Sequence, residues 1–311
     1  MLKVGVVGVG VMGSIHSRIY YEIPGVKLVG VVDKDLERAK KVGKKYGAKA
    51  FEKIEDLIGK VDAVTVAVPT SRHAEVAKFL LKNGIDVLVE KPIALNLEEA
   101  EEMIKIAEEN GRILMVGHVE RFNPIIDVLK NLMKNEKIHE IETRRRNPFY
   151  SRINDCGVVL DLLVHDIDVV RYLTGKEPKI DYVIGDRVKS NYEDWIKVVM
   201  KYGKVPVIHM TDRRTQKKIR KIEVTCEDKL IDVDYINQEM KVFGKAKLVY
   251  DDLPSFVENM ETVKARGEPL KREIMEFLNS VETGVKPKVD GKEGKKNLEI
   301  ALEVLKKMKG I

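Results

Sequence analysis

Short apolar runs alternate with amphipathic stretches over the first 117 residues of the chain. The runs have the length of strands, and they are Leu2–Val7, Lys27–Val32, Ala63–Val68, Asp86–Val89 and Ile113–Gly117, with a weaker run at Ala48–Phe51. The stretches between them place apolar residues on one face of a helix. Strands that alternate with helices are typical of a parallel sheet covered by helices on both faces. The pattern therefore predicts a doubly wound α/β domain.

After Gly117 the alternation stops, and strands begin to follow one another without helices between them. The segments predicted there are a helix at Pro124–Lys134, a strand at Ile138–Arg146, an apolar helix at Val158–Leu173, strands from Ile180 to about Val249, and helices at Leu270–Val281 and Lys292–Lys309. Consecutive strands are typical of an antiparallel sheet. The change of pattern predicts two domains, at 1–118 and 119–311, with a C-terminal helix able to pack back on the first.

The composition is that of a globular protein. The chain has 311 residues, of which 44% are hydrophobic and 34% are charged, which is too apolar for a disordered chain. No apolar run reaches the roughly 18 residues of a membrane helix, and no secretory leader precedes the first strand. The two cysteines, Cys156 and Cys226, fit a reducing compartment. We therefore expect a cytoplasmic protein without a membrane partner.

The charge balance adds little about partners. The net charge of +6 is a small difference between 56 basic and 50 acidic side chains, so it does not indicate nucleic-acid binding. Lys and Glu are abundant, whereas Gln occurs only at Gln216 and Gln238. This balance is reported for proteins that work at high temperature, and it suggests a thermophilic source.

A glycine-rich segment directly follows the first predicted strand. Gly8-Val9-Gly10-Val11-Met12-Gly13 opens a helix, which is the context in which the G-x-G-x-x-G pattern binds a dinucleotide. The first glycine permits a tight turn, the second lets backbone approach a pyrophosphate, and the third lets helix and strand pack closely. The N–H groups at the helix start then face the phosphates. The alternative is an ordinary glycine turn.

An acidic residue at the end of the second strand specifies the cofactor. Asp33 follows Gly13 by about 20 residues, the spacing of the carboxylate that binds the adenosine ribose. Such a carboxylate can accept both hydrogen bonds of the ribose diol and would repel a 2′-phosphate. We therefore predict NAD as the cofactor. Lys34 and Arg38 are nearby, so NADP is the less favoured alternative.

Polar residues in two apolar settings are candidates for catalysis. Glu90-Lys91-Pro92 lies at the carboxyl end of the fifth strand, the edge where open α/β sheets bind ligands. In the apolar helix, Asp161, His165 and Asp168 stand at i, i+4 and i+7, which places them on one helical face. A carboxylate one turn from an imidazole can orient it as a base for an alcohol proton. An ion-paired helix flank is the structural alternative.

A metal site is a further alternative for these three helical residues. No other cluster of His or Cys has the spacing of zinc ligands. We therefore predict no metal.

Together these motifs resemble the Gfo/Idh/MocA family of NAD(P)-dependent oxidoreductases. The segments that carry the resemblance are the glycine loop, Glu90-Lys91-Pro92, Gly117-His118-Val119-Glu120-Arg121-Phe122-Asn123-Pro124, Asp161-Leu162-Leu163-Val164-His165-Asp166-Ile167-Asp168, and the Glu268-Pro269-Leu270 helix entry with Phe277. The chain departs from many relatives where a run of glycines would precede the apolar helix, because it has Asn154-Asp155-Cys156-Gly157 there.

The resemblance implies an N-terminal Rossmann domain and a C-terminal α/β domain with a large, mostly antiparallel open sheet, whose exposed face commonly makes homodimers or homotetramers. It also implies that Lys91 and His165 are the catalytic pair and that Asp161 contacts substrate or orients the histidine. The expected reaction moves a hydride from a ring carbinol carbon to C4 of NAD. His165 accepts the hydroxyl proton, and Lys91 hydrogen-bonds the same oxygen.

The complete predicted cofactor site is larger than the two motifs. It consists of Gly8, Gly10, Val11, Met12, Gly13, Asp33, Lys34, Arg38, Val68, Thr70, His73, Glu90 and Lys91.

Arginines before the apolar helix are candidate substrate ligands. On a strand, Arg144 and Arg146 share a face and Arg145 takes the other, so two guanidinium groups could bind a diphosphate. A solvated strand face is the alternative. Arg121 and Asn123 are further candidates. With Lys91, Asp161, His165 and Asp168, these residues form the predicted substrate site.

The resemblance points to sugars, inositols and nucleotide-linked sugars as substrates. The segment from His118 to Pro124 is similar to relatives that oxidise C3 of UDP-N-acetylglucosamine-type sugars, which makes such a nucleotide sugar the expected substrate. A free-sugar, inositol or dihydrodiol dehydrogenase is the enzymatic alternative. A non-catalytic NAD-binding sensor or regulator is the other, with Arg144–Arg146 and Arg213–Lys218 as phosphate contacts.

Overall fold

The chain folds into two units. The computed structural model describes residues 1–149, 156–244, 247–250, 254–257 and 259–309, so Asn154 and Asp155 lie outside the described residues. Unit 1 comprises residues 1–119 and 270–299, and unit 2 comprises residues 120–269 and 300–311. The expected second domain, 119–311, differs from unit 2 because residues 270–299 fold with unit 1.

Unit 1 is built on a six-stranded parallel sheet with the strand order β3-β2-β1-β4-β5-β6. Its N-terminal elements are β1 (Leu2–Val7), α1 (Val11–Glu22), β2 (Val26–Val32), α2 (Leu36–Tyr46), β3 (Lys49–Phe51), η1 (Ile54–Leu57), β4 (Ala63–Val66), η2 (Thr70–Arg72), α3 (His73–Lys82), β5 (Asp86–Glu90), α4 (Leu97–Glu109) and β6 (Leu114–Gly117). This topology confirms the predicted doubly wound Rossmann fold.

The sheet of unit 1 is buried on both faces, as its continuous apolar runs require. The side chains of Val4, Val6, Val64 and Leu88 are all 0% exposed. The strand order reverses at β1, which pairs with β2 on one side and β4 on the other. Open α/β sheets bind ligands at the carboxyl ends of the strands beside such a reversal. The fold therefore places the glycine loop, which follows β1, at the expected edge.

Two C-terminal helices contribute to unit 1 although they follow the large sheet in sequence. They are α7 (Pro269–Thr283) and the first half of α8 (Gly291–Lys309). The N–H of Val116 in β6 donates to the carbonyl of Val289 at 2.9 Å. A Cβ on Gly294 would lie 2.5 Å from the side chain of Val116. This close backbone approach explains why residues 270–299 belong with the first sheet.

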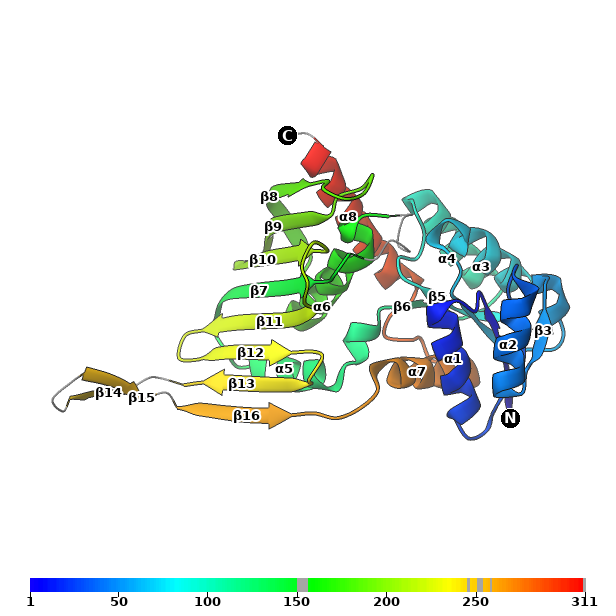
Figure 1. Cartoon of the computed structure of the whole chain (residues 1–311), viewed down its shortest axis with the longest axis horizontal. Helices are drawn as coiled ribbons and strands as arrows, with labels where there is room; N and C mark the ends of the chain where they lie inside the picture. Colours follow the sequence, from blue (N-terminus) through cyan, green and yellow to red (C-terminus); the bar gives the residue numbers. More distant parts are fainter. Residues whose placement is uncertain (150–155, 245–246, 251–253, 258, 310–311) are drawn as a thin grey trace. The chain divides into compact units, whose positions relative to one another are not determined.

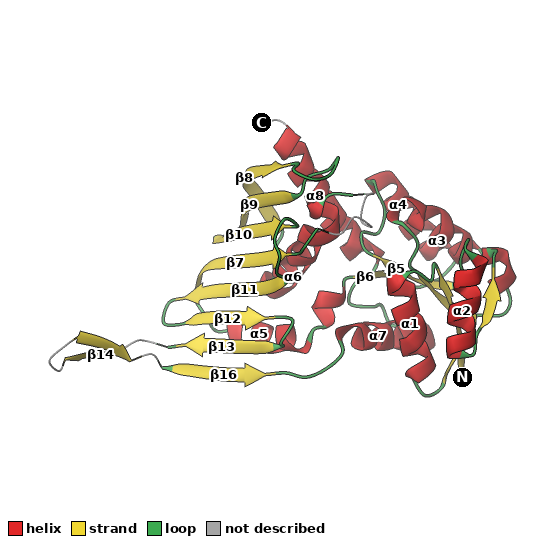
Figure 2. Cartoon of the chain, viewed as in Figure 1, coloured by secondary structure: helices red, strands yellow, loops and turns green. Residues whose placement is uncertain are grey.

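Unit 2 carries an eight-stranded sheet with the order β16-β13-β12-β11-β7-β10-β9-β8, drawn in Figures 1 and 2. Its elements are η3 (Val119–Phe122), α5 (Pro124–Met133), β7 (Ile138–Arg146), η4 (Val159–Leu163), α6 (Val164–Thr174), β8 (Pro178–Asp186), β9 (Trp195–Tyr202), β10 (Val205–Asp212), β11 (Ile219–Cys226), β12 (Leu230–Asp234), β13 (Glu239–Phe243), β14 (Lys247–Tyr250), β15 (Pro254–Val257) and β16 (Met260–Lys264). The neighbouring strands are antiparallel except for the parallel pair β7 and β10. The predicted mostly antiparallel sheet is confirmed.

The two faces of this sheet differ in burial. Along β7, Ile141, Thr143 and Arg145 are buried, whereas Arg144 and Arg146 are only partly so. Arg145 pairs with Asp166 of α6, so the buried face is the one that carries this helix. The alternation of a strand therefore turns Arg144 and Arg146 toward the opposite, open face.

The apolar helix differs from its prediction at its start. We expected one α-helix over Val158–Leu173, but the chain makes a π-helical turn in η4 before α6 begins at Val164. Glu193 imposes this start, since its carbonyl accepts from Val158 N at 3.0 Å and its carboxylate from Val159 N at 3.0 Å. Because a π turn closes i→i+5 hydrogen bonds, the helical spacing assumed for Asp161 does not hold there.

We expect Gly13→Ala to destabilise unit 1 by about 1–3 kcal/mol, as overpacking typically does. A Cβ at this position would lie 1.9 Å from the carbonyl oxygen of Gly8, which cannot move without breaking the loop. Chemical denaturation of the two proteins measures the difference.

Gly10→Ala is the matched control, because a Cβ on Gly10 meets no atom within 4 Å. Its unfolding free energy should stay within about 0.5 kcal/mol of the parent value. Equal losses in the two variants would contradict the proposed close packing at Gly13.

Candidate functional site

The glycine loop is shaped to hold an anion against the start of α1. Gly8 has a φ of +85°, which side chains other than glycine rarely adopt. The open space around Gly10 contrasts with the packed surroundings of Gly8 and Gly13. Helix α1 starts at Val11 without a side-chain cap and without an acidic residue in its first turn. Uncapped N–H groups at a helix start are the usual partners of a phosphate.

Asp33 joins the end of β2 to this loop. It is 6% exposed, and its Oδ2 accepts from Val9 N at 2.9 Å while its Oδ1 accepts from Asp35 N at 2.9 Å. A carboxylate has further lone pairs available for the hydroxyls of a ribose. Arg38 pairs with both Asp33 and Asp35, at 3.4 Å and 3.2 Å. Since its charge is balanced in this way, Arg38 does not offer an uncompensated site for a 2′-phosphate. The residues present thus fit a dinucleotide with a free ribose diol.

The turn that carries Lys91 is anchored by His16 of α1. Its Nε2 lies 3.0 Å from Oε1 of Glu90, at the end of β5. Burial alone would raise the pKa of Glu90, but the hydrogen bond from His16 and the charges of His16 and Lys91 outweigh it, so the pKa is lowered. Glu90 is therefore an anion beside Lys91. No sequence pattern identified His16, because its partner lies on a distant strand.

His73 fixes the same turn from the other side. Its Nδ1 lies 2.8 Å from the carbonyl oxygen of Pro92, and its Nε2 lies 3.0 Å from that of Val68. Burial lowers the pKa of His73, while the two carbonyls act in the opposite direction. Thr70, in η2, is 9% exposed. His73 thus connects two predicted cofactor segments through the backbone.

Asp161 and His165 share the accessible side of a buried helix. In the described run 156–171, only these two residues are partly exposed, and all the remaining residues are buried. Fully buried apolar neighbours such as Leu163 and Val164 hold the backbone in place. The structure therefore presents the predicted acid and imidazole together, although the turn between them is not α-helical. Lys91 lies in unit 1, and its convergence with these residues stays a prediction.

The start of η4 depends on residues that sequence reasoning missed. A Cβ on Gly157 would lie 2.0 Å from the carboxylate of Glu193, and burial raises the pKa of that carboxyl. The adjacent Asp194 accepts from the N–H groups of residues 188–190 and from Arg213. Burial tends to raise the pKa of Asp194, but these hydrogen bonds outweigh it and lower the pKa. Neither acid belongs to a recognisable motif.

Three predicted substrate residues are engaged inside unit 2. Asp168 is 0% exposed and Arg121 is 5% exposed, and the two form a bidentate ion pair whose Nε–Oδ2 distance is 3.0 Å. Asn123 begins α5, and its Nδ2 donates to the carbonyl of Tyr235 at 3.1 Å. These contacts match the structural alternative of an ion-paired flank. A direct contact of these residues with substrate stays a prediction.

Two of the phosphate contacts expected of a regulator, Arg145 and Arg213, form ion pairs inside the fold. Arg145 is 1% exposed and pairs with Asp166. Arg213 is 3% exposed, and it donates to Asp194 at 2.7 Å and to the carbonyl of Cys156 at 3.1 Å. Buried guanidinium groups with such partners are not free to bind nucleic acid. Arg145 and Arg213 therefore give no support to the regulator alternative.

No described group of three or more His, Cys, Asp and Glu side chains could hold a metal ion. Among the helices that the structure describes, none is long and apolar enough to cross a membrane.

Comparison with known proteins agrees with this geometry. Residues 2–118 match the family model of the Gfo/Idh/MocA oxidoreductases for the NAD-binding Rossmann fold, and residues 137–310 match the family's C-terminal alpha/beta domain. The chain is 30% identical to UDP-N-acetylglucosamine 3-dehydrogenase of Acidithiobacillus ferrooxidans, over 97% of this chain and 96% of that one. It is 28% identical to myo-inositol 2-dehydrogenase of Thermotoga maritima, over 94% and 92%.

Solved structures give the same result. The structure of the Acidithiobacillus ferrooxidans dehydrogenase superposes with a TM-score of 0.89 and 29% identity, covering 99% of this chain and 98% of that one. A probable dehydrogenase from Thermotoga maritima superposes with a TM-score of 0.82 and 26% identity, covering 99% and 97%. The chain therefore belongs to the Gfo/Idh/MocA oxidoreductase family, and its first domain is the NAD-binding Rossmann domain of that family.

Proposed function

We propose that this protein is an NAD-dependent dehydrogenase that oxidises a ring CH–OH group of a sugar. The observation that carries the proposal is the pair Asp161 and His165, the only partly exposed residues in the described run 156–171. Apolar residues could fill any packing role at these two positions. Two accessible polar side chains on a buried helix therefore favour a chemical role.

Each residue of the proposed site has its own task. His165 accepts the proton of the reacting hydroxyl, and Asp161 orients the imidazole or contacts the sugar. Lys91 donates a hydrogen bond to the same oxygen and stabilises the negative charge that develops on it. The pair of His16 and Glu90 holds the turn on which Lys91 lies. NAD, which the glycine loop and Asp33 would hold, would supply the acceptor for the hydride of the carbinol carbon.

The cofactor is held by groups that unit 1 already orders. The start of α1 faces the pyrophosphate, and Asp33 accepts from the ribose hydroxyls. Val11 and Met12, which are 57% and 38% exposed, contribute the loop surface. Val68, Thr70 and His73 contribute the edge beyond β4, and Lys34 lies beside Asp33.

A nucleotide sugar is the substrate we propose. The support is the similarity to UDP-N-acetylglucosamine 3-dehydrogenase over nearly the whole of both chains. The inositol dehydrogenases make a cyclic polyol the second candidate. A screen of UDP-sugars, free sugars and inositols, followed by NADH absorbance, distinguishes the two. Activity on none of them would overturn the proposal.

We also propose a cytoplasmic homodimer or homotetramer. The support is that members of this family commonly associate through the open face of the large sheet. Unit 2 has such an open face. Light scattering of the purified protein gives the molecular mass, and a monomer would contradict this part of the proposal.

In the variant His165→Ala, kcat on the true substrate should fall by a factor of about 10² to 10⁴, which is the usual contribution of a positioned base. The Kd of this variant for NAD should be unchanged, since the residues proposed to hold NAD all belong to unit 1 and His165 is not among them. Steady-state kinetics and fluorescence titration with NADH measure the two quantities.

The control for this prediction is His139→Ala, which removes an imidazole that is exposed on β7 and pairs with Glu227. This variant should keep the parent turnover. If His165→Ala behaves like the control, the assignment of the base is wrong.

The cofactor preference should depend on Asp33. Asp33→Ser removes the charge that accepts from the ribose and repels a 2′-phosphate, so the preference for NAD over NADP should fall by about 10-fold to 100-fold. The ratio of kcat/KM for the two cofactors measures it.

Glu37→Gln is the matched control, because Glu37 is an exposed acid on α2 that pairs with Lys40 and not with Arg38. Its cofactor preference should stay unchanged. A parent enzyme that prefers NADP would contradict the role of Asp33.

A further inference from the structure

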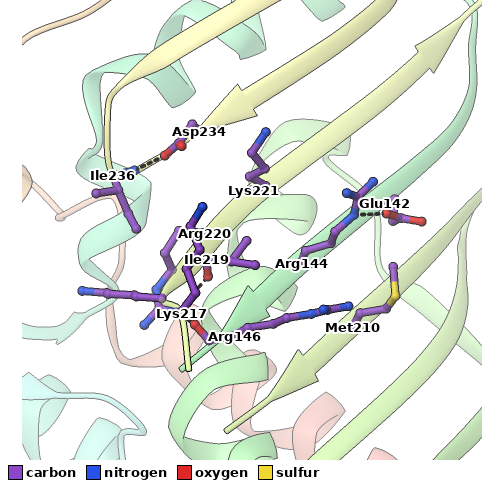
Figure 3. Close-up of a pocket in the computed structure, with 11 residues that line it drawn as sticks. Glu142, Arg144, Arg146, Met210, Lys217, Ile219, Arg220, Lys221, Asp234 and Ile236 are labelled. Atoms are coloured by element: carbon purple, nitrogen blue, oxygen red, sulfur yellow. Dashed lines mark hydrogen bonds and ion pairs between the residues drawn. The ribbon is translucent and has the colours of Figure 1, made fainter. Parts of the chain in front are cut away.

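The open face of the large sheet contains a hollow of about 520 Å³ at the carboxyl end of β7. Its walls come from β7, β10, β11 and the segment that precedes β11. Figure 3 shows Arg144 bending toward Glu142, whereas Arg146 extends along the sheet toward Met210. The volume lies within the roughly 300–1,000 Å³ that is typical of ligand pockets.

The basic residues of this hollow fall into two groups. Arg144 pairs with Glu142 and, at 3.6 Å, with Glu223, and Lys221 pairs with Asp232 at 2.8 Å. The second group has no carboxylate partner among the described residues, and it consists of Arg146, Lys217, Lys218 and Arg220. We call this group the basic pocket.

Arg146 is the least satisfied member of the basic pocket. Its Nε is buried and has no hydrogen-bond partner within the described chain. The neighbouring carboxylate of Asp212 feels the charge of Arg146, but the side chain that donates to it is Arg214, at 3.1 Å and 2.9 Å. A buried donor without an acceptor costs free energy that a bound anion would restore.

Arg220 is opposite Arg145 in the pairing of β11 with β7, so it starts from the helix-bearing face of the sheet and reaches the hollow at the ends of these strands. Its Nη1 donates only to the carbonyls of Arg146 and Ile219, at 3.4 Å and 3.2 Å. Burial and the nearby charge of Arg145 lower the pKa of Arg220 to about 10, although the carboxylates of Glu120, Asp166 and Asp161 act in the opposite direction. Desolvation and the charge of Arg220 lower the pKa of Lys218 in turn. Arg220 and Lys218 thus repel each other and Arg145, and an anion beside Arg220 and Lys218 would relieve this repulsion.

We infer that the basic pocket binds the diphosphate group of a nucleotide-linked sugar. Planar guanidinium groups bind phosphate oxygens in pairs, and the lysines add charge without a fixed geometry. Asp161 lies close enough to Arg220 to act on it electrostatically, which connects the pocket to the end of the helix that carries His165. The inference rests on the proposed function, and it selects nucleotide sugars over free polyols as substrates. Of the two predicted phosphate contacts, the inference keeps Arg146 and drops Arg144, which is already paired.

Calorimetric titration at low salt with UDP, pyrophosphate and inorganic phosphate tests the pocket directly. UDP and pyrophosphate should bind, and the Kd for both should rise about 10-fold or more in Arg146→Ala. Lys217→Ala should weaken binding less, and it cannot unfold the protein because Lys217 is exposed. Raising the salt concentration should weaken binding in the parent protein.

Arg187→Ala is the matched control, since it removes an exposed arginine that follows β8. It should leave the Kd for UDP unchanged. Equal effects of Arg146→Ala and Arg187→Ala would overturn the inference. So would phosphate that binds as tightly as UDP, which would indicate an adventitious ion only. A changed molecular mass of Arg146→Ala with unchanged UDP binding would also overturn it, because the arginine would then serve subunit contact.

Kinetics separate this inference from the proposed function. With a nucleotide sugar as substrate, Arg146→Ala should raise KM about 10-fold or more while kcat and the Kd for NAD remain. Dehydrogenation of nucleotide sugars that does not depend on Arg146 would overturn the pocket and leave the proposed function intact. Binding of UDP that depends on Arg146, without dehydrogenation of any sugar, would support the pocket and overturn the proposed function.

Discussion

The buried guanidinium of Arg145 fixes the helix on which the proposed chemistry depends. Its Nε donates to Asp166 at 2.9 Å, and its Nη1 donates to Glu120 at 3.0 Å. Burial lowers the pKa of Arg145, but the charges of Asp166 and Glu120 outweigh this and raise it. Because removing one partner of a buried ion pair costs about 3–5 kcal/mol, β7 and α6 are tightly coupled. Asp166 follows His165 in sequence, so the same contact also determines where the imidazole lies.

In unit 1, too, polar contacts between distant segments hold the side chains of the proposed site in place. Asp33 and Glu90 lie at the carboxyl ends of β2 and β5, His16 and His73 lie on α1 and α3, and each contacts a neighbouring segment. Asp33 accepts from the glycine loop, His16 reaches Glu90, and His73 approaches the carbonyls of Val68 and Pro92. A site whose groups are held in this way loses little conformational entropy when a ligand binds. The loops of the cofactor site are thus ordered by the fold itself.

The three adjacent arginines of β7 have different environments. They show how much of a side chain's surroundings the alternation of strand faces can predict. The period of two correctly separated Arg145 from Arg144 and Arg146. It could not show that Arg144 has carboxylate partners while Arg146 Nε has no partner in the described chain. The partners of Arg144 lie on β7 and β11, and only the folded geometry shows which arginine they reach. The period of two also could not show that Arg121 and Asp168 pair with each other instead of facing outward.

The order of apolar runs, the glycine spacing and the position of Asp33 were enough to predict the Rossmann fold and its cofactor, because these signals are local and repeat with a known period. The sequence also placed Asp161 and His165 on one apolar helix. Only the tertiary structure decided that this helix begins with a π turn, that Glu193 holds its start, and that residues 270–299 return to the first unit. These features depend on contacts between residues far apart in the chain, and such contacts leave no periodic pattern in the sequence.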